Sequence, residues 1–73
     1  MKNGDLPSVL DPVALLSERP ADRLVRGQVG TVIELLDAET AMVEFAGDDG
    51  AAFAILPCAL NDLIVLHDKP QAA

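Results

Sequence analysis

The side chains with the chemistry of a catalytic site are few. Cys58 and His67 are the single cysteine and the single histidine of the chain, and with Asp62 or Asp68 as the orienting carboxylate they would form a nucleophile and its base. Such a site depends on a mutual geometry that the sequence does not supply. A lone cysteine next to Pro57 is more often a small buried hydrophobic residue, so we expect no catalytic residues.

The spacing of candidate ligands along the chain does not indicate a metal site or a phosphate site. Cys58, His67 and Asp68 lack the paired ligand spacing of a zinc site, such as Cys-x-x-Cys. The Asp-Asp-Gly segment at 48–50 lacks the alternating ligands and terminal Glu of an EF-hand loop, and it indicates a solvated turn. No glycine-rich loop opens a helix next to a lysine, as a phosphate-binding loop requires. We therefore expect no metal and no cofactor.

Charge is distributed unevenly along the chain. Twelve Asp and Glu against five Lys and Arg give a net charge of −7. Residues 28–67 contain no Lys or Arg, whereas Arg19, Arg23 and Arg26 lie together in one short polar stretch. The acids either keep a small aliphatic domain soluble or form a docking face for a basic partner. The arginines either pair with the protein's own acids or bind an anion or a carboxylate-rich partner.

The same composition argues against nucleic-acid binding. A chain with this net charge repels the phosphate backbone of a duplex. Phe45 and Phe53 are the only aromatic residues, with no Trp or Tyr, so no platform for base stacking is present. We expect a protein partner instead.

The chain is long enough for one small domain. It has 73 residues, 51% of them hydrophobic, which is enough for a single aliphatic core. Residues 1–10 and 69–73 lack a pattern and are expected to be flexible tails around a domain at 11–68. One cysteine excludes an internal disulfide, and no apolar run resembles a signal peptide or a membrane span. We expect a cytoplasmic protein.

Short apolar runs separated by turn signals predict an all-β fold. The predicted strands are 12–16, 29–36, 41–45, 51–56 and 63–67, with turns at 37–40 and 47–50, a long polar connection at 17–28 and a 3₁₀ turn at 58–61. A helix over 51–60 is the competing interpretation, but Pro57 in its interior would cost about 3 kcal/mol. We expect Pro57 to end the fourth strand. This order predicts a small five-stranded SH3-like barrel, closed or nearly closed.

Alternation along the strands assigns two faces to the predicted sheet. The residues predicted to point inward are Val29, Thr31, Ile33, Leu35, Ala41, Val43, Phe45, Phe53 and Ile55. Those predicted to point outward are Val32, Glu34, Leu36, Met42, Glu44, Ala52, Ala54 and Leu56. The outer face thus mixes acidic and apolar residues, and contiguous apolar surface can mark an association site. Alternatively, the barrel curls and the tails cover these apolar residues, so that they form no association site.

The segment Arg26-Gly27-Gln28-Val29-Gly30-Thr31-Val32 carries a resemblance. Together with Val43-Glu44-Phe45 and the final apolar run 63–67, it resembles the bacterial family called domain of unknown function 4926, over residues 11–70. The resemblance implies the small barrel fold and brings no catalytic residues, because members have no assigned activity. The resemblance also implies, for some members, neighbouring genes that are toxin-like or otherwise uncharacterised.

The same segment is similar to the KOW motif of SH3-like transcription and ribosomal proteins and to SH3-like electron-transport accessory chains. It departs from KOW proteins in being acidic around the motif, which argues against RNA binding. In physical terms Gly27 and Gly30 allow positive φ or close backbone approach where the long loop enters a strand. Arg26 is expected to lie across the barrel end near an acid. We expect these residues to be structural.

These observations predict a non-enzymatic protein-binding module. The module binds through its acidic strand face or through its exposed sheet edge. Its concrete form is an antitoxin-like or immunity-like protein that masks a basic partner through the acidic strand face, with these expected contacts: Glu34, Leu36, Met42, Glu44, Arg19 and Arg23. The alternative is a homodimer that buries Val32, Leu36, Met42 and Leu56, or an accessory subunit of a larger complex such as an oxidoreductase. The third hypothesis is nucleic-acid binding in the manner of KOW proteins.

Overall fold

The computed structural model describes residues 6–47 and 52–67, with the side chains of Ala52 and Phe53 left out. The predicted faces of those two residues, and the predicted turn at 47–50 after its first residue, lie outside this description. The strands are β1 (Pro12–Leu15), β2 (Val29–Asp37), β3 (Thr40–Ala46), β4 (Ala52–Ala59) and β5 (Leu63–Val65), with 3₁₀ turns η1 (Pro20–Asp22) and η2 (Leu60–Asp62).

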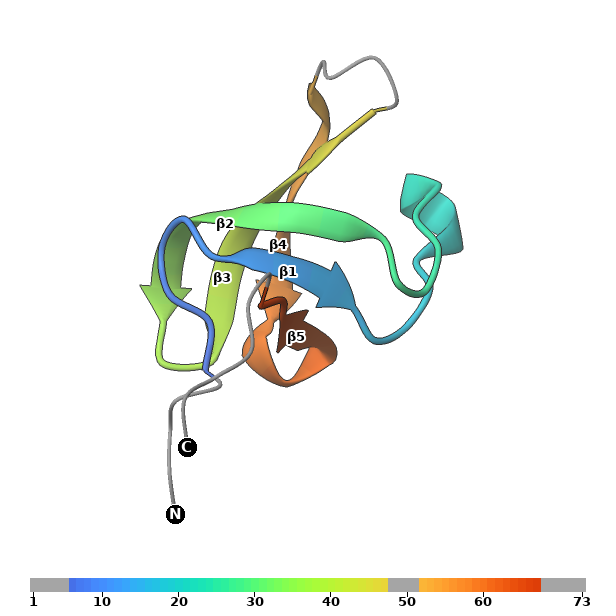
Figure 1. The fold of residues 1–73 in the computed structure, drawn as a ribbon. Coiled ribbons are helices and arrows are strands. Elements are labelled where there is room, and N and C mark those ends of the chain that lie inside the picture. The colour runs from blue at the N-terminus through green and yellow to red at the C-terminus, as the bar shows by residue number, and fades with distance from the viewer. Residues whose placement is uncertain (1–5, 48–51, 68–73) are drawn as a thin grey trace.

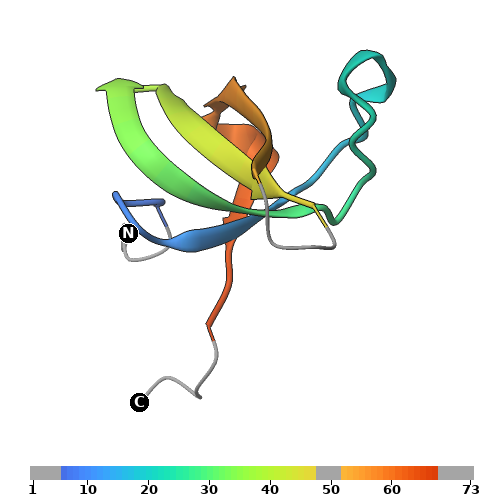
Figure 2. The same ribbon diagram turned by 90° about the horizontal axis from the view of Figure 1, so that it is seen from above.

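All five strands belong to one antiparallel sheet in the order β4-β3-β2-β1-β5. The prediction of an all-β fold with five strands and a 3₁₀ turn before the last strand is therefore confirmed. The sheet is strongly curved, with β2 long enough to pair with both β1 and β3 (Figures 1 and 2). It is open, and β4 and β5 form its two edges.

The described core lies inside this curve and is aliphatic apart from one phenylalanine and one cysteine. Its buried members are Val13, Leu15, Leu24, Val32, Ala41, Val43, Phe45, Cys58 and Leu63. Every strand with described side chains contributes, and Leu24 reaches the core from the long connection between β1 and β2. The sequence analysis did not identify Leu24 as a core residue, because it is an isolated apolar position in a polar stretch.

Strand β4 continues through Pro57, so the prediction that Pro57 ends it is wrong. The Leu60 N–H donates to the Glu39 carbonyl at 2.8 Å, and alternate residues of an antiparallel strand bond to the same neighbour. The backbone nitrogen of Pro57 therefore faces the open edge of the sheet, where no ladder hydrogen bond is lost. Proline is tolerated in edge strands for this reason.

The first half of β2, before the irregularity that follows Val32, faces the opposite way from the prediction. Val29 and Thr31, predicted to point inward, are at least partly exposed, as are Ile33 in the irregularity and Leu35 beyond it. Val32, predicted to point outward, is fully buried and lies directly opposite the inward-pointing Val43 of β3. Because β2 is apolar on both faces, alternation alone does not choose between them. The irregularity between Val32 and Glu34 restores the predicted facing in the second half of the strand, where Glu34 lies opposite Met42 and Leu35 lies opposite the buried Ala41.

The same reversal occurs in β4. Ile55, predicted to point inward, is 51% exposed, while Cys58 is buried. Leu56, predicted to point outward, packs against the core. Both inward residues lie opposite buried residues of β3, since Leu56 faces Val43 and Cys58 faces Ala41. The inward positions predicted for Ala41, Val43 and Phe45 of β3 are confirmed.

Part of the expected N-terminal tail is joined to the sheet by a turn. The Asp11 N–H donates to the Ser8 carbonyl at 3.0 Å, and the Leu10 N–H donates to the Val32 carbonyl at 2.7 Å. The Ser8 N–H donates to the Asp11 carboxylate at 2.9 Å. Pro7 is buried. The turn holds Leu10 at φ 76° with 74% of its surface exposed.

Replacing Leu10 by glycine is expected to stabilise the protein by about 0.5–1 kcal/mol. A left-handed conformation costs a residue with a Cβ roughly 1–2 kcal/mol, which exceeds the entropic cost of glycine, and an exposed side chain loses little packing. Urea denaturation measures the change. The matched control is Val9→Gly, also exposed but without a positive φ, which should destabilise. A lower midpoint for Leu10→Gly would contradict the expectation.

Candidate binding site

The outer side of β2, β3 and β4 carries acidic and apolar side chains together. Glu34 lies opposite Met42, and Glu44 lies opposite Ile55 on the other side of β3. We call these four residues the acidic face. Glu34 and Ile55 are exposed, while Met42 and Glu44 are half-buried. Three of the predicted contact residues are thus neighbours on one surface.

The two carboxylates are diagonal neighbours, not directly opposed. Glu44 pairs with Thr31 on β2, and an irregularity in the β2–β3 register follows Val32. Diagonal positions on adjacent strands lie roughly 7–8 Å apart. Within residues 6–47 and 52–67, neither Glu34 nor Glu44 has an ion pair. The two negative charges therefore share a surface without a cation of the protein's own.

Leu36, the remaining predicted contact on these strands, lies in a second irregularity of the β2–β3 pairing, between the paired residues Leu35 and Asp37. It is 43% exposed. The pairing does not place it among the residues of the acidic face.

The three arginines of the long connection have different environments. The Arg19 guanidinium lies 3.4 Å from Asp22, donates to the Pro57 carbonyl at 3.1 Å and contacts the Cys58 sulfur at 3.3 Å. Arg23 and Arg26 are exposed. Of the two alternatives for the arginines, internal pairing holds for Arg19. Sequence analysis had no signal for its contact with β4, since Arg19 and Pro57 are distant along the chain.

The two glycines of the segment 26–32 have different structural roles. Gly27 is exposed and has φ +88°, with open space where a Cβ would lie. Gly30 is buried and lies opposite Phe45. A Cβ at Gly30 would meet the Val43 side chain at 2.7 Å and the Glu44 carbonyl oxygen at 2.8 Å. Positive φ thus explains the first glycine and close strand packing the second.

Cys58 lies in the core, where only 2% of its surface is exposed. Burial raises the pKa of its thiol above the ordinary value, and the Arg19 guanidinium beside it offsets part of that shift. A thiol with a raised pKa holds little thiolate at neutral pH, and the thiolate is the nucleophilic form. His67, its proposed base, lies beyond the end of β5, while the thiol contacts Arg19.

This raised pKa predicts a loss of stability in alkali. The folded-state pKa lies above the unfolded one, so the stabilisation is complete below the unfolded pKa and falls as the pH rises through the folded pKa. Urea denaturation between pH 7 and 10.5 should show a decline that begins near the ordinary thiol pKa of 9.0. Cys58→Ala should lower stability at every pH but flatten this decline. An identical alkaline decline in both proteins would contradict the assignment.

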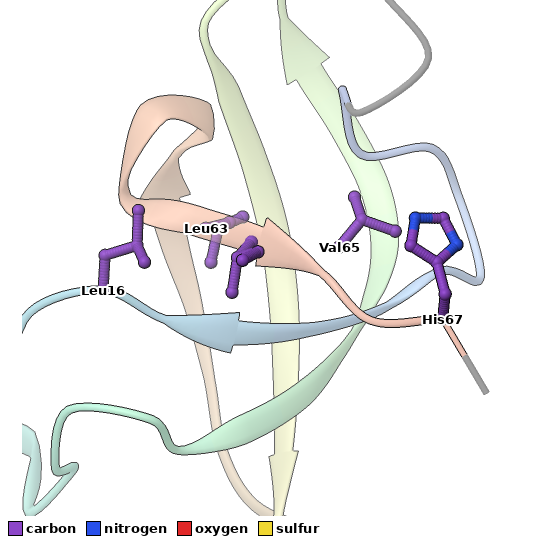
Figure 3. A pocket seen from close by; sticks show the side chains of 5 residues that line it. Leu16, Leu63, Val65 and His67 are labelled. Carbon is purple, nitrogen blue, oxygen red and sulfur yellow. The ribbon is translucent and has the colours of Figure 1, made fainter. Parts of the chain in front are cut away.

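Shallow hollows on the surface include two that are lined by described residues. One of about 300 Å³ is lined by Leu16, Leu63, Ile64, Val65 and His67 along β5 (Figure 3). The other, of about 370 Å³, lies where Leu6 approaches the β2–β3 turn and η2. Within the described residues, no three His, Cys, Asp or Glu side chains gather as metal ligands would. None of the helices in that part of the chain has the length and hydrophobicity to span a membrane.

These features define a small acidic all-β domain with a single curved antiparallel sheet. Residues 9–65 match the family model described as Domain of unknown function (DUF4926), and the chain belongs to this family. No curated protein and no solved structure matches the chain. The expected family membership is confirmed, and the family description carries no activity.

Proposed function

We propose that this chain is a non-enzymatic, cytoplasmic protein-binding module that masks a basic partner with its acidic face, in the manner of an antitoxin or immunity protein. The observation that carries the proposal is the placement of Glu34 and Glu44 beside Met42 and Ile55 on one surface. An arginine of a partner can neutralise these charges and donate bidentate hydrogen bonds to such carboxylates.

The apolar members of this face add contact area that excludes water. Ile55 is exposed, and a methionine adapts its flexible thioether chain to irregular surfaces. A mixture of desolvated apolar contacts and complementary charge is typical of specific interfaces, with the charges steering the encounter. The net charge of −7 extends this steering to the whole chain.

The strand order supports a further proposal, that the sheet belongs to the SH3-like class. The long connection follows β1, the 3₁₀ turn η2 precedes β5, and β1 pairs with both β2 and β5. An open curved sheet of this kind presents an outer face and two edges to partners, which suits a binding module.

The homodimer is less well supported in the form expected from sequence. Val32 is fully buried and Leu56 packs against the core, so neither is available to a second copy. Leu36 and Met42 remain of that set, and a second copy would bring another net charge of −7 to the same surface. A basic partner relieves this repulsion, whereas a dimer through the acidic face increases it.

The test is capture of proteins from a lysate of the source organism with three versions of the chain. Wild type should retain a basic protein that elutes as salt is raised. Glu34→Gln/Glu44→Gln should lose it at least tenfold. Glu18→Gln/Glu39→Gln, with the same charge change at exposed positions elsewhere, should retain it.

Three results would overturn the proposal. These are retention of RNA without a protein, equal retention by both double variants, or a captured partner that is acidic. Light scattering on the free chain at micromolar concentration distinguishes this proposal from the homodimer, because a dimer would indicate self-association.

A further inference from the structure

The two edges of the sheet differ in what they offer to another strand. At the β4 edge, Pro57 supplies no N–H, and its carbonyl already accepts from the Arg19 guanidinium at 3.1 Å. Proline and a charged side chain at an edge both prevent pairing with other chains. The centre of the β4 edge is therefore blocked by the chain itself.

The β5 edge has unpaired backbone groups instead. The Leu16 N–H donates to the Asp62 carbonyl at 2.9 Å and the Leu66 N–H donates to the Pro12 carbonyl at 2.9 Å. Because bonded residues alternate in an antiparallel ladder, Ile64 also bonds to β1, and the backbone groups of Leu63 and Val65 face the open side. The Leu63 N–H donates to the Leu60 carbonyl. The Val65 N–H and the carbonyls of Leu63 and Val65 have no partner among the described residues.

An apolar hollow accompanies this open edge. Leu63 and Val65 project from β5 along it, with Leu16 at one end and His67 at the other (Figure 3). Its volume of about 300 Å³ accommodates an aliphatic side chain. When an extended peptide adds to a sheet edge, its main chain forms hydrogen bonds with the edge strand and its alternate side chains enter pockets beside that strand.

The charges around β5 favour a basic occupant. Asp62 is the last residue of η2, directly before β5, and its carboxylate accepts from the Ser17 hydroxyl at 2.9 Å. Asp11 precedes β1 at the other end of the β1–β5 ladder. Neither carboxylate pairs with a lysine or arginine in the described part of the chain. A second copy would bring the same acids and only three residues of strand, a small area for a stable dimer.

We propose that the β5 edge binds an extended segment of a basic protein, which adds as a sixth strand and places an aliphatic side chain in the hollow. The Val65 N–H and carbonyl form the central pair of the new ladder. This site is separate from the acidic face, because β5 lies at the opposite edge of the sheet from β4.

The test is a titration of the ¹⁵N-labelled Glu34→Gln/Glu44→Gln protein, in which the acidic face is neutralised, with the peptide acetyl-Lys-Val-Lys-Val-Lys-Val-amide. Amide shifts should concentrate at residues 63–65 and at Leu16, and hydrogen exchange of the Val65 amide should slow at least fivefold. The acidic counterpart acetyl-Glu-Val-Glu-Val-Glu-Val-amide should not bind.

Variants of Val65 separate backbone pairing from the hollow. Val65→Pro removes an N–H that the β1 ladder does not use, and should weaken binding at least fivefold, while Val65→Ala keeps the N–H and should weaken it less. A lysine peptide N-methylated on every residue, so that neither edge can donate a backbone N–H, tests the same pairing if Val65→Pro does not fold, and should also bind at least fivefold more weakly.

Several results would overturn the proposal. These are equal binding of the methylated peptide, shifts confined to β2–β4, equal binding of the acidic peptide, or a dimer of the free protein whose shifts map to β5. Because the acidic face is neutralised in this experiment, its outcome is independent of the capture experiment.

Discussion

Replacing Phe45 by alanine is expected to lower the free energy of unfolding by about 3–5 kcal/mol, the range for a fully buried phenylalanine. Phe45 is the largest of the fully buried side chains described, and it lies between Gly30 on β2 and Ala54 on β4. These small neighbours cannot fill the space that the ring leaves. A domain of this length has a total stability of roughly 4–11 kcal/mol, so the variant should be largely unfolded in mild urea.

Urea denaturation followed by circular dichroism measures this effect. Phe45→Leu keeps most of the buried volume and should lose less than half as much. Ile55→Ala removes about half as much apolar side chain from a position that is 51% exposed, and should cost less than about 1 kcal/mol. Similar losses for Phe45→Ala and Ile55→Ala would contradict the assignment of the inner and outer faces.

The second large effect is expected from Gly30→Ala, at about 2–3 kcal/mol of destabilisation, toward the upper end for overpacking a close contact. The added Cβ would lie 2.7 Å from the Val43 side chain and 2.8 Å from both the Glu44 carbonyl oxygen and the Phe45 ring. The backbone oxygen belongs to the β3 ladder and cannot move without disturbing it. Urea denaturation again gives the magnitude.

A double-mutant cycle tests whether the destabilisation by Gly30→Ala comes from the contact of the new Cβ with β3 or from a general cost of alanine at this position. Val43→Ala removes one of the three groups that the added Cβ would meet. The double variant should therefore lose less free energy of unfolding than the two single variants lose in sum. Gly27→Ala is the matched glycine control. It meets open space and suffers only from φ +88°, a cost of roughly 1–2 kcal/mol. Simple additivity in the cycle would show that the collision is relieved elsewhere.

The sequence predicted the elements better than their faces. Turn signals and β-branched runs located all five strands to within a few residues, since these signals act locally. The facing of the first half of β2 was predicted wrongly because Val29, Val32 and Ile33 make both of its sides apolar. Its direction is determined by the β3 register, where Gly30 accommodates Phe45, and this is a tertiary contact.

The candidate site was predictable only in part. Glu34, Met42 and Glu44 share a face in the structure, as predicted, but Glu34 lies there only because the register irregularity after the buried Val32 interrupts the alternation of β2. Arg19 was grouped with Arg23 and Arg26 by proximity in sequence, but its guanidinium contacts β4 instead. An exposed sheet edge was expected, but the sequence did not identify β5 as that edge, because edge position depends on strand order, and strand order depends on pairing between the two ends of the domain.

The pairing of β1 with β5 also bears on how the chain folds. β2, β3 and β4 are consecutive and pair with their sequence neighbours, whereas the β1–β5 ladder joins Val13 to Val65. Closing such a long loop is entropically costly and slows folding relative to local hairpins. During synthesis the meander can form early, but β1 gains its second neighbour only after β5 has left the ribosome. The nascent chain therefore carries an incomplete sheet until translation of the domain ends.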